Sequence, residues 1–308
     1  MTITAAMVKE LRELTGAGVM ACKNALVETD GNQEEAIEVL RKKGEATAVK
    51  KSGRIAAEGI VYTAVKDGKA AIVEVNSETD FVAKNEKFQT FVANVADQII
   101  DSDAADLDAF MEEPWKLDTA KSVKDELVSQ IAVIGENMNI RRFEKITSDG
   151  VIVSYIHAGG RIGVLVEADA PKDPAVEEAL KNVAMQVAAL NAKFVSQDEI
   201  SDEYKEHEKA ILLEQIKNDP KESQKPEKVI NGIIMGRLNK EFKEVCLLDQ
   251  VYVKAEDGKQ SVAKYLEEVS KQVGATVTLK KFVRFETGEG LEKKEENFAE
   301  EVAKQMGN

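Results

Sequence analysis

The sequence predicts an α+β protein with an N-terminal three-helix bundle, a duplicated core of two antiparallel-sheet and helix subdomains, an inserted helical hairpin and a C-terminal helical module. Three patterns lead to this prediction. Hairpin signals followed by helical patterns occur twice, about 92 residues apart. Short helical patterns fill the first fifty residues, and two long charged helical patterns flank residues 218–220. The expected divisions are residues 1–54, 55–147, 148–286 with the hairpin at about 198–248, and 287–308.

The composition argues against several classes of function. A net charge of −14 disfavours nucleic acid phosphates as the main target. Cys22 and Cys246 show no pairing pattern, which is typical of a reducing cytosol, and two histidines cannot build a histidine–cysteine metal site. The chain has no N-terminal secretion signal and no run of 18 apolar residues. We therefore expect a cytoplasmic protein with no metal, no cofactor and no membrane partner.

The first 54 residues predict three short helices followed by a linker. Thr4 is a candidate cap for the first helix, Gly16 ends that helix, and Asn32 with Glu35 forms a candidate capping box for the third. Basic residues at 41–43 and 50–54 predict a solvated linker. Arg12, Met20 and Lys23 surround a candidate docking groove for a partner helix. The alternative is that Met20 belongs to the core and that Lys23 is merely solvated.

The core is expected to contain two similar halves. Residues 59–75 and 150–166 each predict a β-hairpin, and each hairpin is followed by a helix. Between the halves, the acidic residues 101–118 predict a solvated loop anchored by Trp115. A helix from about Val123 is expected to stop at Gly135. Alternating apolar residues at 277–285 predict a strand that completes the second sheet.

Glu78–Asn85 lies where a strand pattern meets a helix pattern, and it allows two interpretations. Asp80 is either a helix N-cap or a group that meets a partner, and Phe81 is either a hydrophobic staple or a partner-facing wedge. The second half has Ala168–Asp173 at the matching point, without an aromatic residue. A staple needed for folding would be expected in both halves, so this difference favours the partner-facing interpretation of Phe81.

The region from Asp198 to about Lys217 and the region after Pro226 predict two long antiparallel helices, which would form a protruding hairpin or short coiled coil. Gly232 and Gly236 fall within the second helix, where each costs about 1 kcal/mol relative to Ala. Asn297 is a candidate N-cap for a last helix, which would form the C-terminal helical module.

Five strings resemble motifs of the elongation factor Ts family, the guanine nucleotide exchange factors of elongation factor Tu. They are V-K-E-L-R-E-L-T-G-A-G-V-M-A-C-K from Val8, T-D-F-V-A-K-N from Thr79, I-G-E-N-M-N-I-R-R from Ile134, Y-I-H-A-G-G-R-I-G-V-L-V from Tyr155 and K-P-E-K-V-I-N-G-I-I-M-G from Lys225. The resemblance covers essentially the whole chain in element order. Gln186 and Ala192 depart from the family, where histidine and proline would be expected.

The resemblance implies a fold, a partner and contact residues. The bundle would be of the ubiquitin-associated type, and the partner would be elongation factor Tu, bound through its nucleotide domain and a second domain. Exchange and Mg²⁺ displacement would fall to Thr79, Asp80, Phe81 and Val82, and further contacts to Ile134, Gly135, His157, Arg12, Met20 and Lys23. A complex of higher order with Tu stays open. For Ile134 a buried position before a glycine cap is an equal alternative, and a lone histidine beside a turn is usually only a polar strand end.

Two other functions are alternatives to exchange. A cysteine hydrolase would use Cys22 or Cys246 with a histidine, although no histidine has a telling spacing to either thiol. A ubiquitin-binding adaptor would use residues 1–44 and would leave the rest of the chain without a task. The sequence thus predicts an exchange factor that performs no covalent chemistry.

Overall fold

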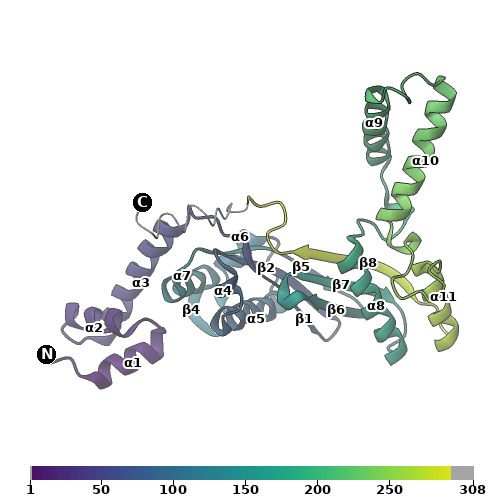
Figure 1. The fold of residues 1–308 in the computed structure, drawn as a ribbon. Coiled ribbons are helices and arrows are strands. Elements are labelled where there is room, and N and C mark those ends of the chain that lie inside the picture. Colours follow the sequence, from purple (N-terminus) through teal and green to yellow (C-terminus); the bar gives the residue numbers. More distant parts are fainter. Residues whose placement is uncertain (1, 293–308) are drawn as a thin grey trace.

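The computed structural model describes residues 2–292 of the chain. Figure 1 shows an extended molecule, with a helical bundle at one end, two small sheets and their helices in the middle, and a long helical hairpin projecting from the other end. The mixture of helices and antiparallel sheets confirms the α+β class. Within residues 2–292, no helix is long and apolar enough to cross a membrane.

The N-terminal bundle consists of α1 (Ala5–Thr15), α2 (Val19–Glu28) and α3 (Gln33–Lys51). The Thr4 hydroxyl caps α1 by accepting from the Met7 amide, and Gly16 ends it in the left-handed conformation. Asn32 caps α3 through its side-chain oxygen, but the Glu35 carboxylate accepts from the Asn32 side-chain amide, so the reciprocal capping box is not formed. The bundle core contains Leu11, Cys22, Ala25, Leu26 and Ala36, all fully buried.

The prediction of a linker before residue 54 is wrong for most of its length. The helix α3 continues to Lys51, so its second half contains the basic residues that were expected in a solvated linker. That half packs against α7 (Val123–Ile134), where Gly44 lies close to Ala132. The second half of α3 therefore extends the bundle as continuous helix up to the core, and residues 52–57 join α3 to β1.

Two three-stranded antiparallel sheets form the centre of the molecule. The first has the order β1 (Glu58–Lys66), β2 (Lys69–Ser77), β5 (Met138–Thr147), and the second has the order β6 (Val151–His157), β7 (Ile162–Asp169), β8 (Thr278–Glu286). A two-residue turn with positive φ at Asp67 and Gly68 joins β1 to β2, as the Asp-Gly signal predicts. A short helix η1 (Ala158–Gly160) joins β6 to β7.

The two sheets share further local features. Each has a register shift between its second and third strands, next to Glu74 in the first sheet and Glu167 in the second. A Cβ on Gly59 would lie 2.1 Å from the Val75 carbonyl oxygen, and one on Gly150 would lie 2.2 Å from that of Ala168. Both hairpins thus need a glycine where their first strand begins, because the opposite strand passes too close for a side chain.

Each sheet has one face covered by helices, and their other faces meet. The helix α5 (Glu86–Asp101) packs on β1 and β2, and α8 (Pro174–Leu190) packs on β6 and β7 with α11 (Val262–Val273) behind it. Along β2 the side chains alternate. Ala71, Val73 and Val75 join the helical core, whereas Ala70 and Ile72 face the second sheet. Leu165 and Phe285 meet them from the opposite side.

Residues 101–118 do not form the single solvated loop that was expected. They include α6 (Leu107–Glu112) and β3 (Pro114–Trp115), which pairs with β4 (Asp118–Ser122). Trp115 is buried, as predicted, but so is Phe110 on α6. Phe110 packs against Phe143 on β5, and the burial of this apolar surface stabilises α6 within the acidic segment.

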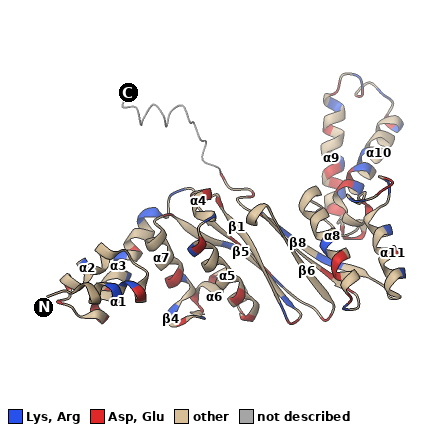
Figure 2. Ribbon diagram, turned by 60° about the horizontal axis from the view of Figure 1, so that its bottom comes forward, with Lys and Arg blue, Asp and Glu red and all other residues tan. Residues whose placement is uncertain are grey.

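The helical hairpin is formed by α9 (Asp202–Asn218) and α10 (Glu227–Val245), as predicted. It is bordered by the short helices η2 (Gln197–Glu199) and η3 (Leu247–Asp249). Figure 2 shows acidic and basic residues interspersed along both helices, as expected of a solvated hairpin. Gly232 and Gly236 are exposed, with no atom within 4 Å of an added Cβ. After β8 the described chain continues in turns to residue 292, and the predicted helix capped by Asn297 lies outside the described residues.

Candidate functional site

The most exposed large apolar side chain among residues 2–292 lies directly after the first β-hairpin. Phe81 is 81% exposed and belongs to the four-residue helix α4 (Asp80–Ala83). Its neighbours hold this helix in place, because Ala83 is buried and Val82 is half-buried against the core of the first subdomain. The staple interpretation is therefore wrong: Phe81 does not cover the first turn of any helix, and its ring is presented to solvent.

Thr79, not Asp80, is the N-cap of α4. The Thr79 hydroxyl accepts from the Val82 amide and donates to Glu136 Oε1 at 2.7 Å. The Thr79 backbone amide donates to Glu136 Oε2 at 3.0 Å, so one carboxylate holds this residue twice. Of the two interpretations of Asp80, the N-cap is wrong, because Thr79 stands one residue earlier in the β-conformation and takes that role.

A second carboxylate ties the same loop to the same neighbour. Glu78 accepts from the Asn137 amide at 2.6 Å and pairs with Arg54 at 3.4 Å. The Asn137 side chain in turn donates to the Arg54 carbonyl at 2.8 Å. Glu78 and Thr79 are thus bound to residues 136–137 and to Arg54, which follows the N-terminal bundle, so the start of α4 is held in place.

Asp80 is exposed, next to Phe81. Its Oδ2 accepts from the Lys84 ammonium at 2.6 Å, one helical turn further on. This hydrogen bond and the positive charge of Lys84 lower the pKa of Asp80 below its ordinary value. The carboxylate is therefore ionised at neutral pH and is available to accept hydrogen bonds from an approaching molecule.

Ile134 and Gly135 lie beside this loop, as their sequence neighbourhood with Glu136 requires. Gly135 has φ +87° and ends α7 in the left-handed conformation, and its carbonyl accepts from the Lys51 ammonium of α3. Ile134 is half-buried against the core. The structure therefore brings together Thr79–Val82 and Ile134–Gly135, with one apolar and one charged group exposed at Phe81 and Asp80.

His157 belongs to the second subdomain. It is the last residue of β6, its ring is exposed, and its Nδ1 lies 3.0 Å from the Tyr155 hydroxyl. The following helix η1 contacts β1, and α4 contacts the same strand. The two candidate contact elements are therefore carried by different subdomains that meet at β1.

Arg12, Met20 and Lys23 lie on the N-terminal bundle, apart from the Phe81 loop, and all three are exposed. Met20 is 63% exposed, so the interpretation that it belongs to the core is wrong. Leu14, Val19 and Val27 are also more than half exposed on α1 and α2. The bundle therefore presents an apolar surface with basic residues beside it, which is typical of a protein-binding surface.

The thiols are poorly placed for chemistry. Cys22 and Cys246 are both fully buried, and burial together with nearby Asp249 and Glu199 raises the pKa of Cys246 to about 11. A buried, protonated thiol cannot act as a nucleophile, which argues against the hydrolase alternative. Within residues 2–292, no three histidine, cysteine, aspartate or glutamate side chains are grouped as they would be around a metal ion.

Sequence reasoning missed Glu136, Glu78 and Lys84, the residues that hold the exposed loop. Glu136 lies inside the I-G-E-N motif that identified Ile134 and Gly135, so the motif itself was the available signal. Its role depends on a contact with Thr79 over 57 positions of sequence, which no local pattern reveals.

Comparisons with known proteins agree with the motifs. A family model described as "Elongation factor TS" matches residues 78–289. A protein named elongation factor Ts from Clostridium perfringens is 53% identical over 309 residues, with 99% of each chain covered. Proteins of the same name from Clostridium novyi and Clostridium botulinum are 53% and 51% identical over 308 residues, covering 99% of this chain and 99% and 98% of theirs.

Proposed function

Because the chain belongs to the elongation factor Ts family, we propose that Phe81 and its neighbours form the element that drives nucleotide exchange on elongation factor Tu. The chain is a translation elongation factor that acts as a guanine nucleotide exchange factor for Tu. The exposure of Phe81 on a braced loop is the observation that supports this assignment to a particular element. Such a factor would act in the cytoplasm.

The first step of the proposed mechanism is the insertion of the Phe81 ring into an apolar slot between two helices of Tu's nucleotide domain. An aromatic side chain that is already exposed loses little protein contact when it binds and gains burial. The bracing of Thr79 by Glu136 supports this step, because a wedge can separate two helices only if its own base is fixed. Val82 would widen the apolar contact at the base of the ring.

The second step concerns charge. Asp80 would accept hydrogen bonds from groups of Tu that otherwise surround Mg²⁺ and the nucleotide phosphates. Its low pKa supports this role, because an ionised carboxylate accepts hydrogen bonds more strongly than a neutral one. The displaced helices and side chains would release Mg²⁺ and then GDP, and no bond of the nucleotide would be broken.

Further contacts would share the work of binding. A single aromatic hot spot supplies about 2–4 kcal/mol, which is less than stable binding requires. We assign secondary contacts to Ile134 and Gly135 beside the wedge, to His157, and to the bundle surface around Arg12, Met20 and Lys23. All of these except the half-buried Ile134 are exposed, and their spread over two subdomains and the bundle supports an interface that spans more than one domain of Tu.

We also propose that the bundle is of the ubiquitin-associated type and that the two core halves arose by duplication. The domain divisions would be residues 1–54, 55–147, 148–286 and 287–308. The shared strand order, register shifts and hairpin glycines of the two sheets support the duplication.

In this mechanism, the binding of the chain to Tu and the binding of GDP to Tu are thermodynamically linked. The chain binds nucleotide-free Tu most tightly, so it must weaken the binding of GDP by the same factor by which GDP weakens its own binding. GTP, when it is in excess, then refills the site and releases the factor.

The test is stopped-flow release of fluorescent GDP from Tu, with wild-type chain, Phe81→Ala and Val65→Ala. Val65 is also an exposed apolar residue, but it lies at the opposite end of β1 from the α4 loop, so it is the matched control. Removing the wedge should slow release at least about 30-fold, equivalent to about 2 kcal/mol. The thermal unfolding temperature should not change, because the ring makes few contacts in the free chain.

Each outcome has a definite meaning. If Phe81→Ala releases GDP as fast as wild type, Phe81 is not the wedge, although the chain remains an exchange factor. If Val65→Ala is slowed equally, the loss reflects general damage and not the loop. If wild type does not accelerate release, exchange through these contacts is wrong.

A further inference from the structure

A buried carboxylate lies where the two sheets meet, and neither the sheet fold nor the exchange loop explains it. Glu74 on β2 is fully buried and points to the same side as Ala70 and Ile72, towards the second subdomain. A charge without partners would be very costly in such a position. Its surroundings therefore indicate what this carboxylate holds together.

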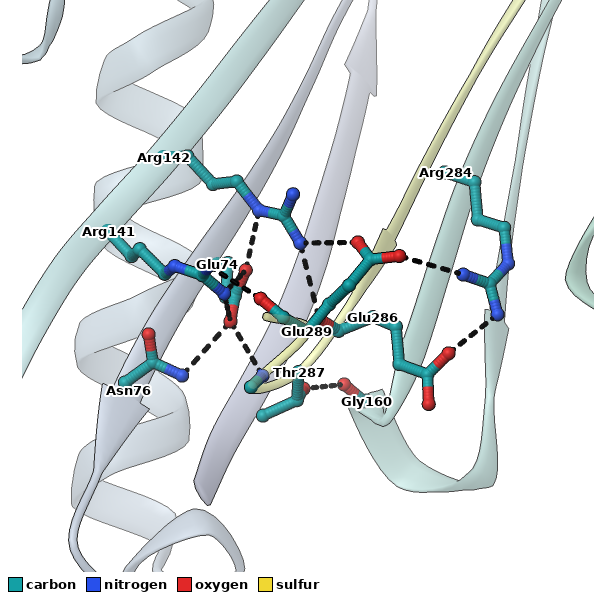
Figure 3. Close-up of polar contacts among 10 residues, drawn as sticks. Glu74, Asn76, Arg141, Arg142, Gly160, Arg284, Glu286, Thr287 and Glu289 are labelled. Carbon is teal, nitrogen blue, oxygen red and sulfur yellow. Dashed lines mark hydrogen bonds and ion pairs between the residues drawn. The ribbon is translucent and has the colours of Figure 1, made fainter. Parts of the chain in front are cut away.

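Glu74 has partners from three directions (Figure 3). Arg142 Nε donates to it at 2.6 Å, Arg141 Nη1 donates at 3.0 Å, and Asn76 Nδ2 donates at 3.0 Å. The fourth partner is the Gly288 amide at 2.8 Å, which belongs to the turn after β8 of the other subdomain. The two arginines come from β5 and the asparagine from β2, so the carboxylate joins both sheets.

The segment Glu286–Glu289 is held by the same arginines. Arg142 Nη2 donates to the Glu286 carbonyl at 3.2 Å and to the Glu289 carboxylate at 3.1 Å, and Arg141 Nη2 donates to the Glu289 carbonyl at 2.6 Å. Arg284 pairs with Glu286 and Glu289. We call these residues, with Asn76, Thr287 and Gly288, the Glu74 cluster. Its three arginines and three glutamates balance in charge.

The same segment also holds the loop that follows His157. The Thr287 hydroxyl donates to the Gly160 carbonyl at 3.1 Å, and the Thr287 amide donates to the Arg161 carbonyl at 2.9 Å. Adjacent residues 287 and 288 therefore bind η1 on one side and β2 on the other. From Glu74 the chain runs to the end of β2 at Ser77 and then to Thr79 and Phe81. The segment Glu286–Glu289 therefore connects the two elements assigned to Tu contact.

The matching position in the second sheet shows that this arrangement is not a general need of the fold. Glu167 occupies the place of Glu74 beside the register shift, and Lys281 is its cross-strand partner as Arg142 is that of Glu74. Yet Glu167 is only half-buried, and Lys281 pairs with Glu144 on the outside at 3.0 Å. Of these two matching positions, only Glu74 is fully buried and bonded to the other subdomain.

We propose that the Glu74 cluster fixes the relative position of the Thr79–Val82 loop and of His157, and that fast nucleotide exchange requires this fixed position. The proposal rests on the proposed function, since it assumes that both elements meet Tu. Glu74 is thus a positioning residue that touches neither Tu nor the nucleotide. Two rigidly connected contacts bind together more strongly than two loosely connected ones, because less freedom is lost on binding.

The experiment compares wild type with Glu74→Gln, Thr287→Val and the control Glu144→Gln. Glu144→Gln also breaks an ion pair between β5 and β8, but one that is exposed and outside the cluster. Two quantities are measured: the rate of GDP release from Tu at saturating factor, and the distance between spin labels placed on the exposed Lys87 of α5 and Lys181 of α8. We expect Glu74→Gln to slow release about tenfold and to broaden the label distance, with Thr287→Val changing both in the same direction and Glu144→Gln changing neither.

A second readout separates positioning from general destabilisation. In the wild-type background, His157→Ala should slow GDP release by some factor. In the Glu74→Gln background, the same substitution should slow GDP release by less than half that factor, because His157 is no longer held in place. Equal factors in both backgrounds would overturn the proposal, as would a slowed release with an unchanged label distance or a broadened distance with unchanged release. If Glu74→Gln does not fold, Thr287→Val decides by the same criteria. Failure of wild type itself to release GDP would instead overturn the proposed function.

Discussion

The two cysteines illustrate how its surroundings decide the chemistry of a residue. Cys22 packs in the bundle core, and Cys246 lies at the base of the hairpin with the hairpin's apolar residues around it. Neither thiol is accessible, and the pKa of Cys246 is raised to about 11 by burial and by nearby carboxylates. Both residues therefore serve as small apolar side chains.

This burial predicts the reactivity of the thiols towards an aromatic disulfide reagent. At pH 8 only about one part in a thousand of Cys246 is ionised when its pKa is about 11. The folded chain should therefore react slowly, and both thiols should react at once in denaturant, as followed by absorbance. The pKa of Cys246 is higher in the folded state than in the unfolded state, so the unfolded chain loses this proton first as the pH rises. The free energy of unfolding is therefore unaffected by this thiol below about pH 8.5 and falls as the pH rises towards 11. Rapid reaction of either thiol in the native chain would contradict the burial.

At the scale of single residues, the sequence predicted which residues are exposed better than what holds them. The T-D-F-V-A-K-N motif and the absence of an aromatic residue at the matching point of the second half together predict a partner-facing Phe81, and Phe81 is exposed. The sequence offers Asp80 as a possible cap, whereas Thr79 takes that role, because both residues suit it and the boundary of a four-residue helix has no periodic signal. The bracing by Glu136 could not be predicted from local patterns.

At the scale of elements, the helical hairpin is the part most independent of the rest. Its apolar cluster contains Ile200, Ile216, Ile234, Leu238, Phe242 and Cys246, and it is separate from the core of the second subdomain. The helices α9 and α10 pack mainly on each other, and their contacts with the neighbouring chain lie at the hairpin's base, where α10 meets η3 and Tyr204 of α9 meets Phe194. The helices α9 and α10 should therefore unfold and refold locally while the two sheets stay folded.

Ile234→Ala tests this independence. Ile234 is almost fully buried in the hairpin cluster, so its truncation should cost about 2–4 kcal/mol. Hydrogen exchange measured by mass spectrometry should show faster exchange in α9 and α10 and no change in α5. Met235→Ala is the matched control, because this neighbouring residue is 54% exposed. If protection also falls in α5, the hairpin and the core unfold as one unit.

The elements themselves were largely predictable, and the two exceptions share a cause. The lysines in the second half of α3 predict a linker, and the carboxylates of residues 101–118 predict a loop, but both segments contain helix. In both cases charged residues cover the solvent side of a segment whose other side packs on distant residues, α3 on α7 and Phe110 on Phe143. The charged residues of these two segments indicate only that one side is solvated. Whether the segments are helical depends on the tertiary contacts of the other side.

At the scale of the whole molecule, the arrangement of parts follows from contacts between residues far apart in sequence. Arg41 on α3 pairs with Asp125 on α7 at 3.1 Å, Gly44 packs on Ala132, and Lys51 reaches the Gly135 carbonyl. These contacts set the bundle at a fixed angle to the core, and the Glu74 cluster does the same for the two sheets. Neither arrangement could be predicted from the chain's patterns, because each depends on pairings that no local signal encodes.

The contact of α3 with α7 predicts that a large side chain at Gly44 will weaken binding to Tu without unfolding the core. A Cβ on Gly44 would lie 3.4 Å from Ala132 Cβ and 3.9 Å from Val128 Cγ1, so alanine fits but leucine does not. Gly44→Leu should push α3 away from α7 and displace the bundle surface around Met20 relative to Phe81. Because two contacts that no longer match cannot bind together, affinity for nucleotide-free Tu, measured by calorimetry, should fall about tenfold. Gly44→Ala should keep wild-type affinity and gain up to about 1 kcal/mol of stability from helix propensity. Equal affinity of the two variants would mean that the bundle contributes nothing to the interface, or that its orientation is set after Tu is bound.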